Sequence, residues 1–255
     1  MIEWWRSTQS ESILKLATSV DGGTIGSQIV LGALTMTVQT ANYAEAIEHL
    51  PPDSTLVFND VAWEEYEGLL DDVGEASGLR ISYDSGRLQV VTLSMSHERY
   101  SEFVQDLVRL LSLKLRIRVL SFGSMTMKKS PSHGLEPDKC FYVQTAPAVE
   151  GKDSIDLATD PPPDVAVEID LHHQSVAKFP IYASLGVPEI WRYDGISMKI
   201  HHLERGEYLP SDSSRALPML SAEILTEFLT RVKKEDQYET LLAFEQWLQS
   251  QSRER

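Results

Sequence analysis

Apolar side chains recur at spacings of three and four in three segments of the chain, which predicts three amphipathic helices. The first can be capped by Asn59 or Asp60 and should end at Gly74. The apolar positions are, in chain order, Trp63, Tyr66, Leu69 and Leu70; then Tyr100, Phe103, Val104, Leu107, Leu110 and Leu111; and, from Ser221 onward, Leu225, Phe228, Leu229 and Val232, continued by Phe244, Trp247 and Leu248. A shorter helix is expected over 177–185.

Strand patterns and turn residues fill the segments between these helices. Asp84-Ser85-Gly86 and Asp194-Gly195 each predict a hairpin. The expected strands are 79–83, 88–93, 118–127, 135–143, 164–171, 189–193 and 198–203. From residue 97 onward the order is helix, three strands, helix, strand. Because strands on either side of a helix can pair in parallel, this order favours an α/β (α+β) fold with a mixed central β-sheet flanked by helices.

The first 35 residues lack this regularity. Trp4 and Trp5 stand among polar residues, and Asp21-Gly22-Gly23 would break a helix or a strand. We expect residues 1–35 to be an extension, or to precede the true start at Met36, and to contribute little to the core. The predicted organisation is therefore an extension at 1–35, the main domain at 36–215 and a C-terminal helical segment at 216–255.

Composition narrows the function classes. With 255 residues, 42% of them hydrophobic, the chain can bury one full core. Its net charge of -15 argues against a general phosphate-binding surface, so any contact with nucleic acid must be local, assisted by a metal or supplied by a partner. Cys140 is the only cysteine, which excludes an internal disulfide. The apolar stretch at 29–38 is too short for a membrane span, and we expect a cytoplasmic protein without a membrane anchor.

The most distinctive chemistry lies in the strand Pro163-Asp-Val-Ala-Val-Glu-Ile-Asp170. Side chains alternate between the faces of a strand, so Asp164, Glu168 and Asp170 share one face. Three carboxylates side by side repel each other, and a bound Mg²⁺ or Mn²⁺ would offset that repulsion. The alternative is a sheet face solvated by water, and the strand alone does not decide between them.

Two further residues, Asp138 and Lys178, are candidates for a site beside this strand. Pro137 biases Glu136 toward an extended conformation, so Asp138 should lie on a short strand, although a turn aspartate is an alternative. Pro180 places Lys178 at the start of a helix, where a lysine opposes the helix macrodipole. A nearby anionic site would explain Lys178, and so would an exposed side chain. The histidines, His97 included, are expected to be solvated or polar-core residues.

Together these segments resemble a known family. Pro-Asp-Val-Ala-Val-Glu-Ile, followed by Lys178-Phe-Pro-Ile-Tyr-Ala-Ser-Leu-Gly-Val-Pro-Glu-Ile-Trp191, is similar to the Uma-two family, a bacterial branch of the PD-(D/E)XK nuclease superfamily. Tyr83-Asp-Ser-Gly-Arg-Leu88 and Ser96-His-Glu-Arg-Tyr100 resemble that family's hairpin and first core helix. The resemblance covers roughly residues 55–205 and implies a restriction-endonuclease-like core.

The resemblance also implies a site. Asp138 and Glu168 match the two acidic motif residues, and they would hold Mg²⁺ or Mn²⁺ with the carbonyl of Ile169. Asp170 stands where the superfamily usually has a lysine, and Lys178 on the next helix matches the displaced lysine. Catalytic roles thus fall on Asp138, Glu168 and Lys178, with Glu98 and Asp170 as additional candidates.

The implied activity is metal-dependent cleavage of DNA, with DNA as partner and a homodimer as an open alternative. The competing hypothesis keeps the fold without catalysis, as a binding or regulatory module. A basic rim around Asp138 and Glu168 would favour a DNA path. The candidate residues for it are Lys128, Lys129, Lys139 and Arg99.

Overall fold

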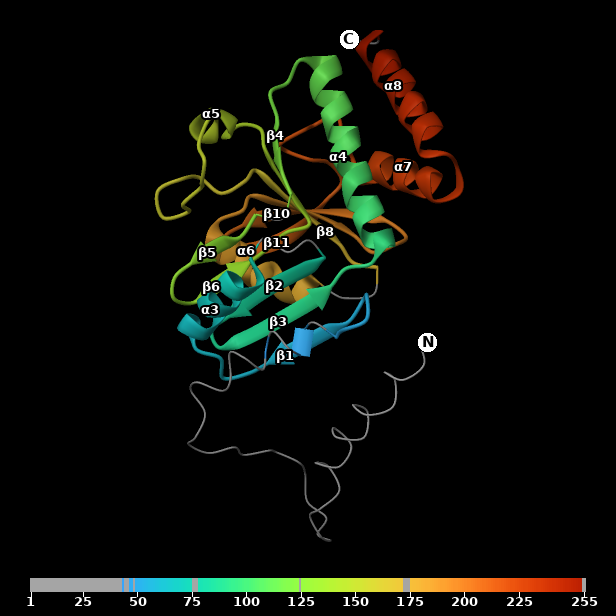
Figure 1. Ribbon diagram of the computed structural model, residues 1–255. Coiled ribbons are helices and arrows are strands. Elements are labelled where there is room, and N and C mark those ends of the chain that lie inside the picture. The colour runs from blue at the N-terminus through green and yellow to red at the C-terminus, as the bar shows by residue number, and fades with distance from the viewer. Residues whose placement is uncertain are drawn as a thin grey trace, which may run out of the picture. The chain divides into compact units, whose positions relative to one another are not determined.

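The described part of the chain is a mixed α/β structure with two β-sheets (Figure 1). The computed structural model describes residues 43, 46–47, 49–74, 78–123, 125–171 and 175–253. All of these fall within one compact unit, Thr37–Arg255. The prediction that residues 1–35 contribute little to the core lies outside the described residues.

The first sheet has five strands in the order β1-β3-β2-β6-β5, and all its neighbouring strands are antiparallel. The strands are β1 (Thr55–Phe58), β2 (Leu79–Asp84), β3 (Arg87–Thr92), β5 (Met127–Lys129) and β6 (His133–Leu135). The predicted hairpin around Ser85 and Gly86 is confirmed, since it joins β2 to β3. Both turn residues, Ser85 and Gly86, have positive φ (47° and 99°), as a two-residue hairpin turn of type I′ requires.

The second sheet has six strands in the order β11-β10-β9-β8-β7-β4. They are β4 (Leu120–Phe122), β7 (Lys139–Tyr142), β8 (Val165–Ile169), β9 (Glu189–Tyr193), β10 (Met198–Glu204) and β11 (Glu207–Ser211). β8 and β9 are parallel, and the other pairs in this sheet are antiparallel. The predicted order of helix, three strands, helix and strand is found here as α4, β4, β7, β8, α6 and β9.

Six α-helices and a short 3₁₀ turn accompany the sheets in the described residues. They are α3 (Trp63–Val73), α4 (Met95–Leu115), α5 (Ala146–Val149), the 3₁₀ turn η1 (Ser175–Lys178), α6 (Phe179–Leu185), α7 (Ala222–Lys234) and α8 (Gln237–Arg253). Helices α4, α7 and α8 pack against one another, and α4 also contacts β8 (Figure 1). Helix α6 contacts β5, β6 and β11, so it lies against both sheets. No helix in this described part combines the length and apolar character needed to cross a membrane.

Several predicted boundaries were wrong because the chain changes sheet. The segment predicted as one strand at 118–127 contains β4 of the second sheet and the start of β5 of the first. The segment at 135–143 likewise divides into the end of β6 and all of β7 around Glu136-Pro137-Asp138. Pro137 cannot donate a ladder hydrogen bond, which suits a point of exchange between sheets. The fold thus has two sheets where one was predicted.

The helix ends also differ from the prediction. Neither Asn59 nor Asp60 caps α3; Ala62 is its N-cap residue, and the Ala62 N–H donates to the Glu65 carboxylate (2.8 Å). This bond satisfies the N–H of the N-cap residue itself, as the glutamate half of a capping box does, while Ala62 offers no side-chain acceptor to the next N–H groups. The predicted C-terminal helix is divided at Glu235 into α7 and α8.

Both faces of β8 are covered, which positions the site. Val165, Val167 and Ile169 pack into the core with α4, α7 and α8. Ala166, on the opposite face, packs with residues of α6 such as Tyr182. A solvated face, the alternative left open by the sequence, is therefore wrong for this strand, and its acidic residues must be satisfied within the protein.

Cys140 should be a structural residue. It is fully buried on β7, and burial raises the pKa of its thiol to about 12, so the thiolate is scarce at neutral pH. We expect the native protein to resist a thiol reagent such as Ellman's until it unfolds. Cys140→Ala should lower the free energy of unfolding by about 1–2 kcal/mol and spare activity. Loss of activity at unchanged thermal stability would contradict this.

Candidate functional site

Asp138 lies at the point where the chain passes from the first sheet to the second. Its N–H donates to the Val167 carbonyl, which extends the ladder between β7 and β8 (3.0 Å). Its carboxylate accepts from Arg80 Nε of β2 (3.0 Å) and from the Ile169 N–H of β8 (2.7 Å). His97 of α4 completes the set, with Nε2 3.0 Å from Oδ2. Asp138 thus lies at a bend just before β7 and not on a strand, as the turn alternative had it, but it is buried and its partners come from three elements.

The electrostatic surroundings keep Asp138 ionised. Burial by itself raises the pKa of this carboxyl group, but the His97 hydrogen bond and the charges of His97, Arg80 and Lys178 outweigh it and lower the pKa below its ordinary value. A carboxylate with hydrogen bonds to its charged form behaves in this way.

Glu168 projects from β8 toward α6 and is also buried. Lys178 Nζ lies 2.9 Å and 3.1 Å from its two oxygens, and the Tyr182 hydroxyl donates to Oε1. Burial raises the pKa of Glu168 to about 7 against the opposing charge of Lys178, and nearby Asp138 and Asp170 add to the rise. Burial is the largest of these causes, so the raised pKa reflects lost solvation of the carboxylate more than an excess of acidic side chains.

Lys178 is the last residue of η1 and the N-cap residue of α6, with Pro180 in the first turn. The predicted position at a helix start is confirmed. Of the two explanations for it, the anionic site is the right one, because Lys178 is buried against Glu168. Burial lowers the pKa of Lys178, but Glu168 and Asp138 outweigh burial and raise it, so the ammonium keeps its charge.

The other two acids of this strand have structural partners. Asp170 accepts from the Ser175 N–H and hydroxyl at the start of η1 and pairs with Arg192 of β9. Asp164 accepts from the Val143 N–H (2.6 Å) and from the backbone and hydroxyl of Thr145. The expected cluster of three adjacent carboxylates is therefore resolved into separate hydrogen-bond networks.

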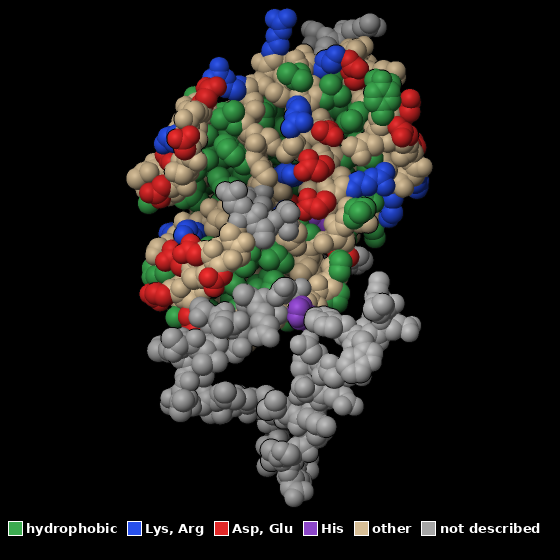
Figure 2. All heavy atoms as spheres, viewed as in Figure 1, with side chains coloured by type: hydrophobic (Ala, Val, Ile, Leu, Met, Phe, Trp, Pro, Cys, Tyr) green, Lys and Arg blue, Asp and Glu red, His purple; other side chains and the backbone are tan. Residues whose placement is uncertain are grey.

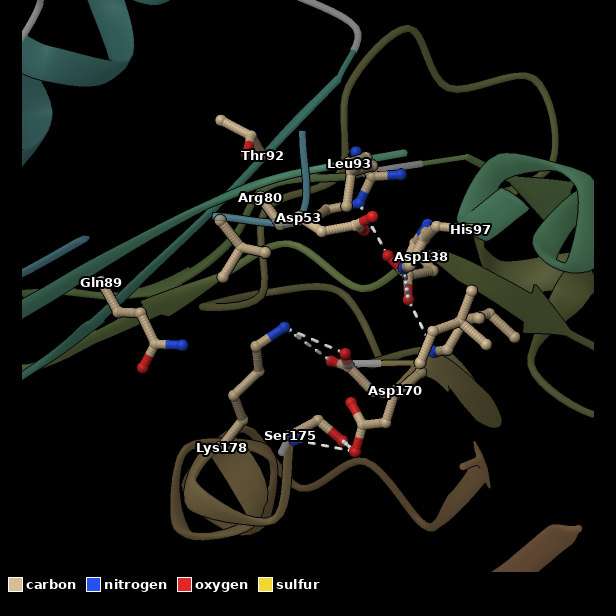
Figure 3. A pocket seen from close by; sticks show the side chains of 14 residues that line it. Asp53, Arg80, Gln89, Thr92, Leu93, His97, Asp138, Asp170, Ser175 and Lys178 are labelled. Atoms are coloured by element: carbon tan, nitrogen blue, oxygen red, sulfur yellow. Dashed lines mark hydrogen bonds and ion pairs between the residues drawn. The ribbon is translucent and has the colours of Figure 1, made fainter. Parts of the chain in front are cut away.

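Asp138, Glu168 and Lys178 line one pocket with a volume of about 440 Å³, counting space open to solvent (Figure 3). Ile169 and Asp170 also line it. Glu98 does not; its carboxylate is 41% exposed and lies 3.6 Å from Arg80 at the edge of the network. The remaining lining residues are Asp53, Arg80, Gln89, Val91, Thr92, Leu93, His97, Leu171 and Ser175.

The donor set fits a cation that retains much of its water. Within the described ranges, no group of three or more His, Cys, Asp and Glu side chains could hold a metal. Mg²⁺, however, commonly takes only one or two protein carboxylates and completes its shell with water and substrate oxygens. Asp138 and Glu168 supply two such carboxylates, and a cation here would have to compete with Lys178 for the oxygens of Glu168.

Sequence reasoning missed several members of the network. Arg80 lies 58 residues before Asp138 in the sequence, on β2 of the first sheet. Nothing in the sequence around Arg80 distinguishes it from any other arginine on a strand. Tyr182 and Arg192 gave no separate signal either. His97 is buried, as a polar-core histidine should be, but it also contacts Asp138, and its Nδ1 is buried without a hydrogen-bond partner.

The four cations considered for a basic rim are engaged elsewhere. Lys128 pairs with Glu67 and Lys139 with Glu102. Lys129 donates to the Ser184 carbonyl, Arg99 donates to the Val232 carbonyl, and none of the four lines the pocket. Figure 2 shows acidic and basic side chains interspersed over the visible face. The four cations that would have favoured a DNA path therefore do not line the pocket.

Arg80 should be needed for the stability of this site. Removing one partner of a buried ion pair typically costs about 3–5 kcal/mol, because the other charge stays buried. We expect Arg80→Ala to lower the free energy of unfolding in urea by about this amount. Arg87→Ala, which removes an exposed arginine from the neighbouring strand, is the matched control and should stay within about 0.5 kcal/mol of the wild type. Equal stability of the two variants would show that Asp138 does not depend on Arg80.

Comparison with known proteins gives two findings. Among solved structures, the chain is similar to one titled as a "putative nuclease" from Anabaena variabilis ATCC 29413, at 15% identity and a TM-score of 0.47, covering 66% of this chain and 99% of that one. No curated protein matches the sequence. The model of the Uma2 family, described as "Putative restriction endonuclease", matches residues 63–233, which is more than half of the chain. The chain therefore belongs to the Uma2 family, as its motifs had indicated.

Proposed function

We propose that this protein is a metal-dependent phosphodiester hydrolase that cleaves DNA internally, on a restriction-endonuclease-like core. The observation that carries the proposal is the convergence of Asp138, Glu168 and Lys178 in one pocket. They come from the sheet junction, from β8 and from the end of η1 just before α6, and they are the residues that match the family's motifs. Membership of a family described as endonucleases supports the same activity.

Asp138, Glu168 and the carbonyl of Ile169 would hold Mg²⁺ or Mn²⁺. When bound, the ion would lower the pKa of a water ligand and polarise the scissile phosphate. The chain fixes the ligands beforehand: the Ile169 N–H and Arg80 orient Asp138, and the Tyr182 hydroxyl orients Glu168. Such prior orientation reduces the reorganisation needed during reaction.

Lys178 supplies a positive charge beside these ligands. Its ammonium bridges both oxygens of Glu168. A bound cation would compete for the same oxygens, which would free Lys178 to orient water or to stabilise negative charge on the phosphate. Arg80 adds a second positive charge at the pocket, although its Nε is committed to Asp138.

One observation favours the second hypothesis, a nuclease-fold module that binds without cutting. Lys178 and Arg80 already neutralise much of the charge of Glu168 and Asp138. A site that is stable in this state could persist without a metal. Catalysis and binding must therefore be measured separately.

Circular DNA provides the direct test, because only internal cleavage can open it. We expect the protein to cut single-stranded circles or supercoiled plasmid in the presence of Mg²⁺ or Mn²⁺, and Glu168→Ala to abolish cutting. Glu207→Ala, which removes an exposed glutamate on β11, should cut like the wild type. If no circle is opened with any divalent metal, the endonuclease proposal fails and the binding module becomes the better one.

Lys178→Ala separates metal binding from catalysis. Loss of one preorganised charge-stabilising group typically lowers a rate by about 10²–10³. We expect this loss in cleavage, with Mg²⁺ affinity, measured by calorimetry, unchanged or improved because a competing cation is gone. Lys178→Arg should restore only part of the activity, because a planar guanidinium does not replace a compact ammonium. Full activity of Lys178→Ala would exclude a catalytic role for this lysine.

A further inference from the structure

Arg80 reaches Asp138 from the first sheet, and the three nitrogens of its guanidinium group are not equally engaged (Figure 3). Nε donates to Asp138 Oδ1 (3.0 Å), and Nη1 donates to the Leu79 carbonyl (2.7 Å). Nη2 makes no hydrogen bond within the described residues; the carboxylate of Glu98 lies 3.6 Å from it, which is too far for one. Two nitrogens therefore hold Arg80 in place, while the third is open to another acceptor.

The Nη2 end of Arg80 is also the end that reaches solvent. The whole side chain is only 7% exposed, yet Nη2 is not among the buried polar atoms that lack a partner in the described chain. Its neighbour Glu98 has a side chain that is 41% exposed, whereas Asp138, at the Nε end, is 2% exposed. The guanidinium group thus extends from a buried carboxylate to the edge of the site, with the N–H groups of Nη2 on the outer side.

Glu98 is held more loosely than the next acid along α4. Glu102, one turn later, lies 2.6 Å from Lys139 Nζ, which is a hydrogen-bond distance. The carboxylate of Glu98 accepts no hydrogen bond from the described residues and has Arg80 Nη2 as its ion-pair partner. The macrodipole favours an acid in the first turn of a helix, which explains a glutamate here without any function. It does not explain why this glutamate lies beside the open nitrogen of Arg80.

An exposed carboxylate in this place stands where a phosphate oxygen can bind. Guanidinium groups bind phosphate through their N–H groups, and hydrogen bonds between ions are typically about 2.7–2.9 Å long. A phosphate oxygen at that distance from Nη2 would gain a bond that Glu98 does not make. Because exposed ion pairs contribute little to stability, displacing Glu98 from Arg80 would cost little.

We infer that Nη2 of Arg80 is a phosphate contact at the edge of this site, and that Glu98 holds this position until substrate displaces it. The inference rests on the proposed function, because it takes a DNA phosphate as the ligand. Arg80 then has two tasks: its Nε orients Asp138, and its Nη2 binds the substrate. Glu98 regulates the affinity for DNA and is not the metal ligand that the sequence left open.

Two substitutions that remove the same charge from successive turns of α4 test the inference. Glu98→Gln removes the competitor at Arg80, while Glu102→Gln is the control, because its amide oxygen can still accept from Lys139. Fluorescence anisotropy with a labelled DNA duplex in Ca²⁺ should show about threefold to tenfold tighter binding by Glu98→Gln than by the wild type. Glu102→Gln should stay within about twofold of the wild type. Equal affinities of the two variants, or no binding of DNA by either, would overturn the inference.

The gain should depend on the outer nitrogen of Arg80. Arg80→Lys keeps a positive charge but lacks the guanidinium fork, and circular dichroism establishes first that this variant is folded. In the Arg80→Lys background, adding Glu98→Gln should change DNA affinity by less than about twofold, because the contact that Glu98 blocks is gone. A gain as large as in the wild-type background would overturn the assignment to Nη2. If Arg80→Lys does not fold, the comparison of Glu98→Gln with Glu102→Gln decides alone.

Metal affinity and cleavage separate this inference from the alternatives. Calorimetry should give Glu98→Gln the Mg²⁺ affinity of the wild type, because Glu98 does not line the pocket. A loss of about tenfold or more would make Glu98 a metal ligand and overturn the inference. In cleavage assays the gain should appear as a lower KM at unchanged kcat. If no DNA is cleaved but Glu98→Gln still binds DNA more tightly than Glu102→Gln, the nuclease proposal fails while the phosphate contact stands.

Discussion

The buried carboxylate of Asp138 is the interaction on which the site depends. An isolated ion in the interior costs several kcal/mol, and it is tolerated only with partners that satisfy its oxygens. Its partners come from β2, α4 and β8, so the two sheets and the long helix must meet around it. The exchange between sheets at Glu136-Pro137-Asp138 delivers the carboxylate to this meeting point. The pocket lies there because no single element could satisfy the charge alone.

Charge matching extends from Asp138 to its neighbours. Asp138 faces Arg80, Glu168 faces Lys178 and Asp170 faces Arg192, so each of these three acids has one principal cation. Under the proposed function, a divalent ion would have to compete with Lys178 for the oxygens of Glu168. A +2 ion there, with the displaced ammonium still nearby, would increase the positive charge that faces a phosphate.

The sequence predicted what depends on local patterns. Apolar periodicity identified α4, the alternation along β8 separated Val167 from Glu168, and Pro180 placed Lys178 at a helix start. It did not predict which distant segments meet. The alternation of a strand looks the same in either sheet, so the sequence did not show that the chain passes from the first sheet to the second between β6 and β7. Arg80 resembles any strand arginine until the structure brings β2 beside Asp138. Burial of the acidic face was equally undetermined, since it depends on where α6 packs.

The position of Lys178 on a helix follows from the register of the sheet. The resemblance to the nuclease superfamily implies a lysine two residues after Glu168, but Asp170 occupies that place. Arg192, on the parallel neighbouring strand, is in register with Glu168 and pairs with Asp170. A lysine at position 170 would put two cations side by side and leave Arg192 without its acid, which is unfavourable at a buried position. Asp170 satisfies Arg192 and also holds the start of η1 through Ser175. Because η1 leads directly into α6, Asp170 also helps to hold the turn that brings Lys178 to Glu168.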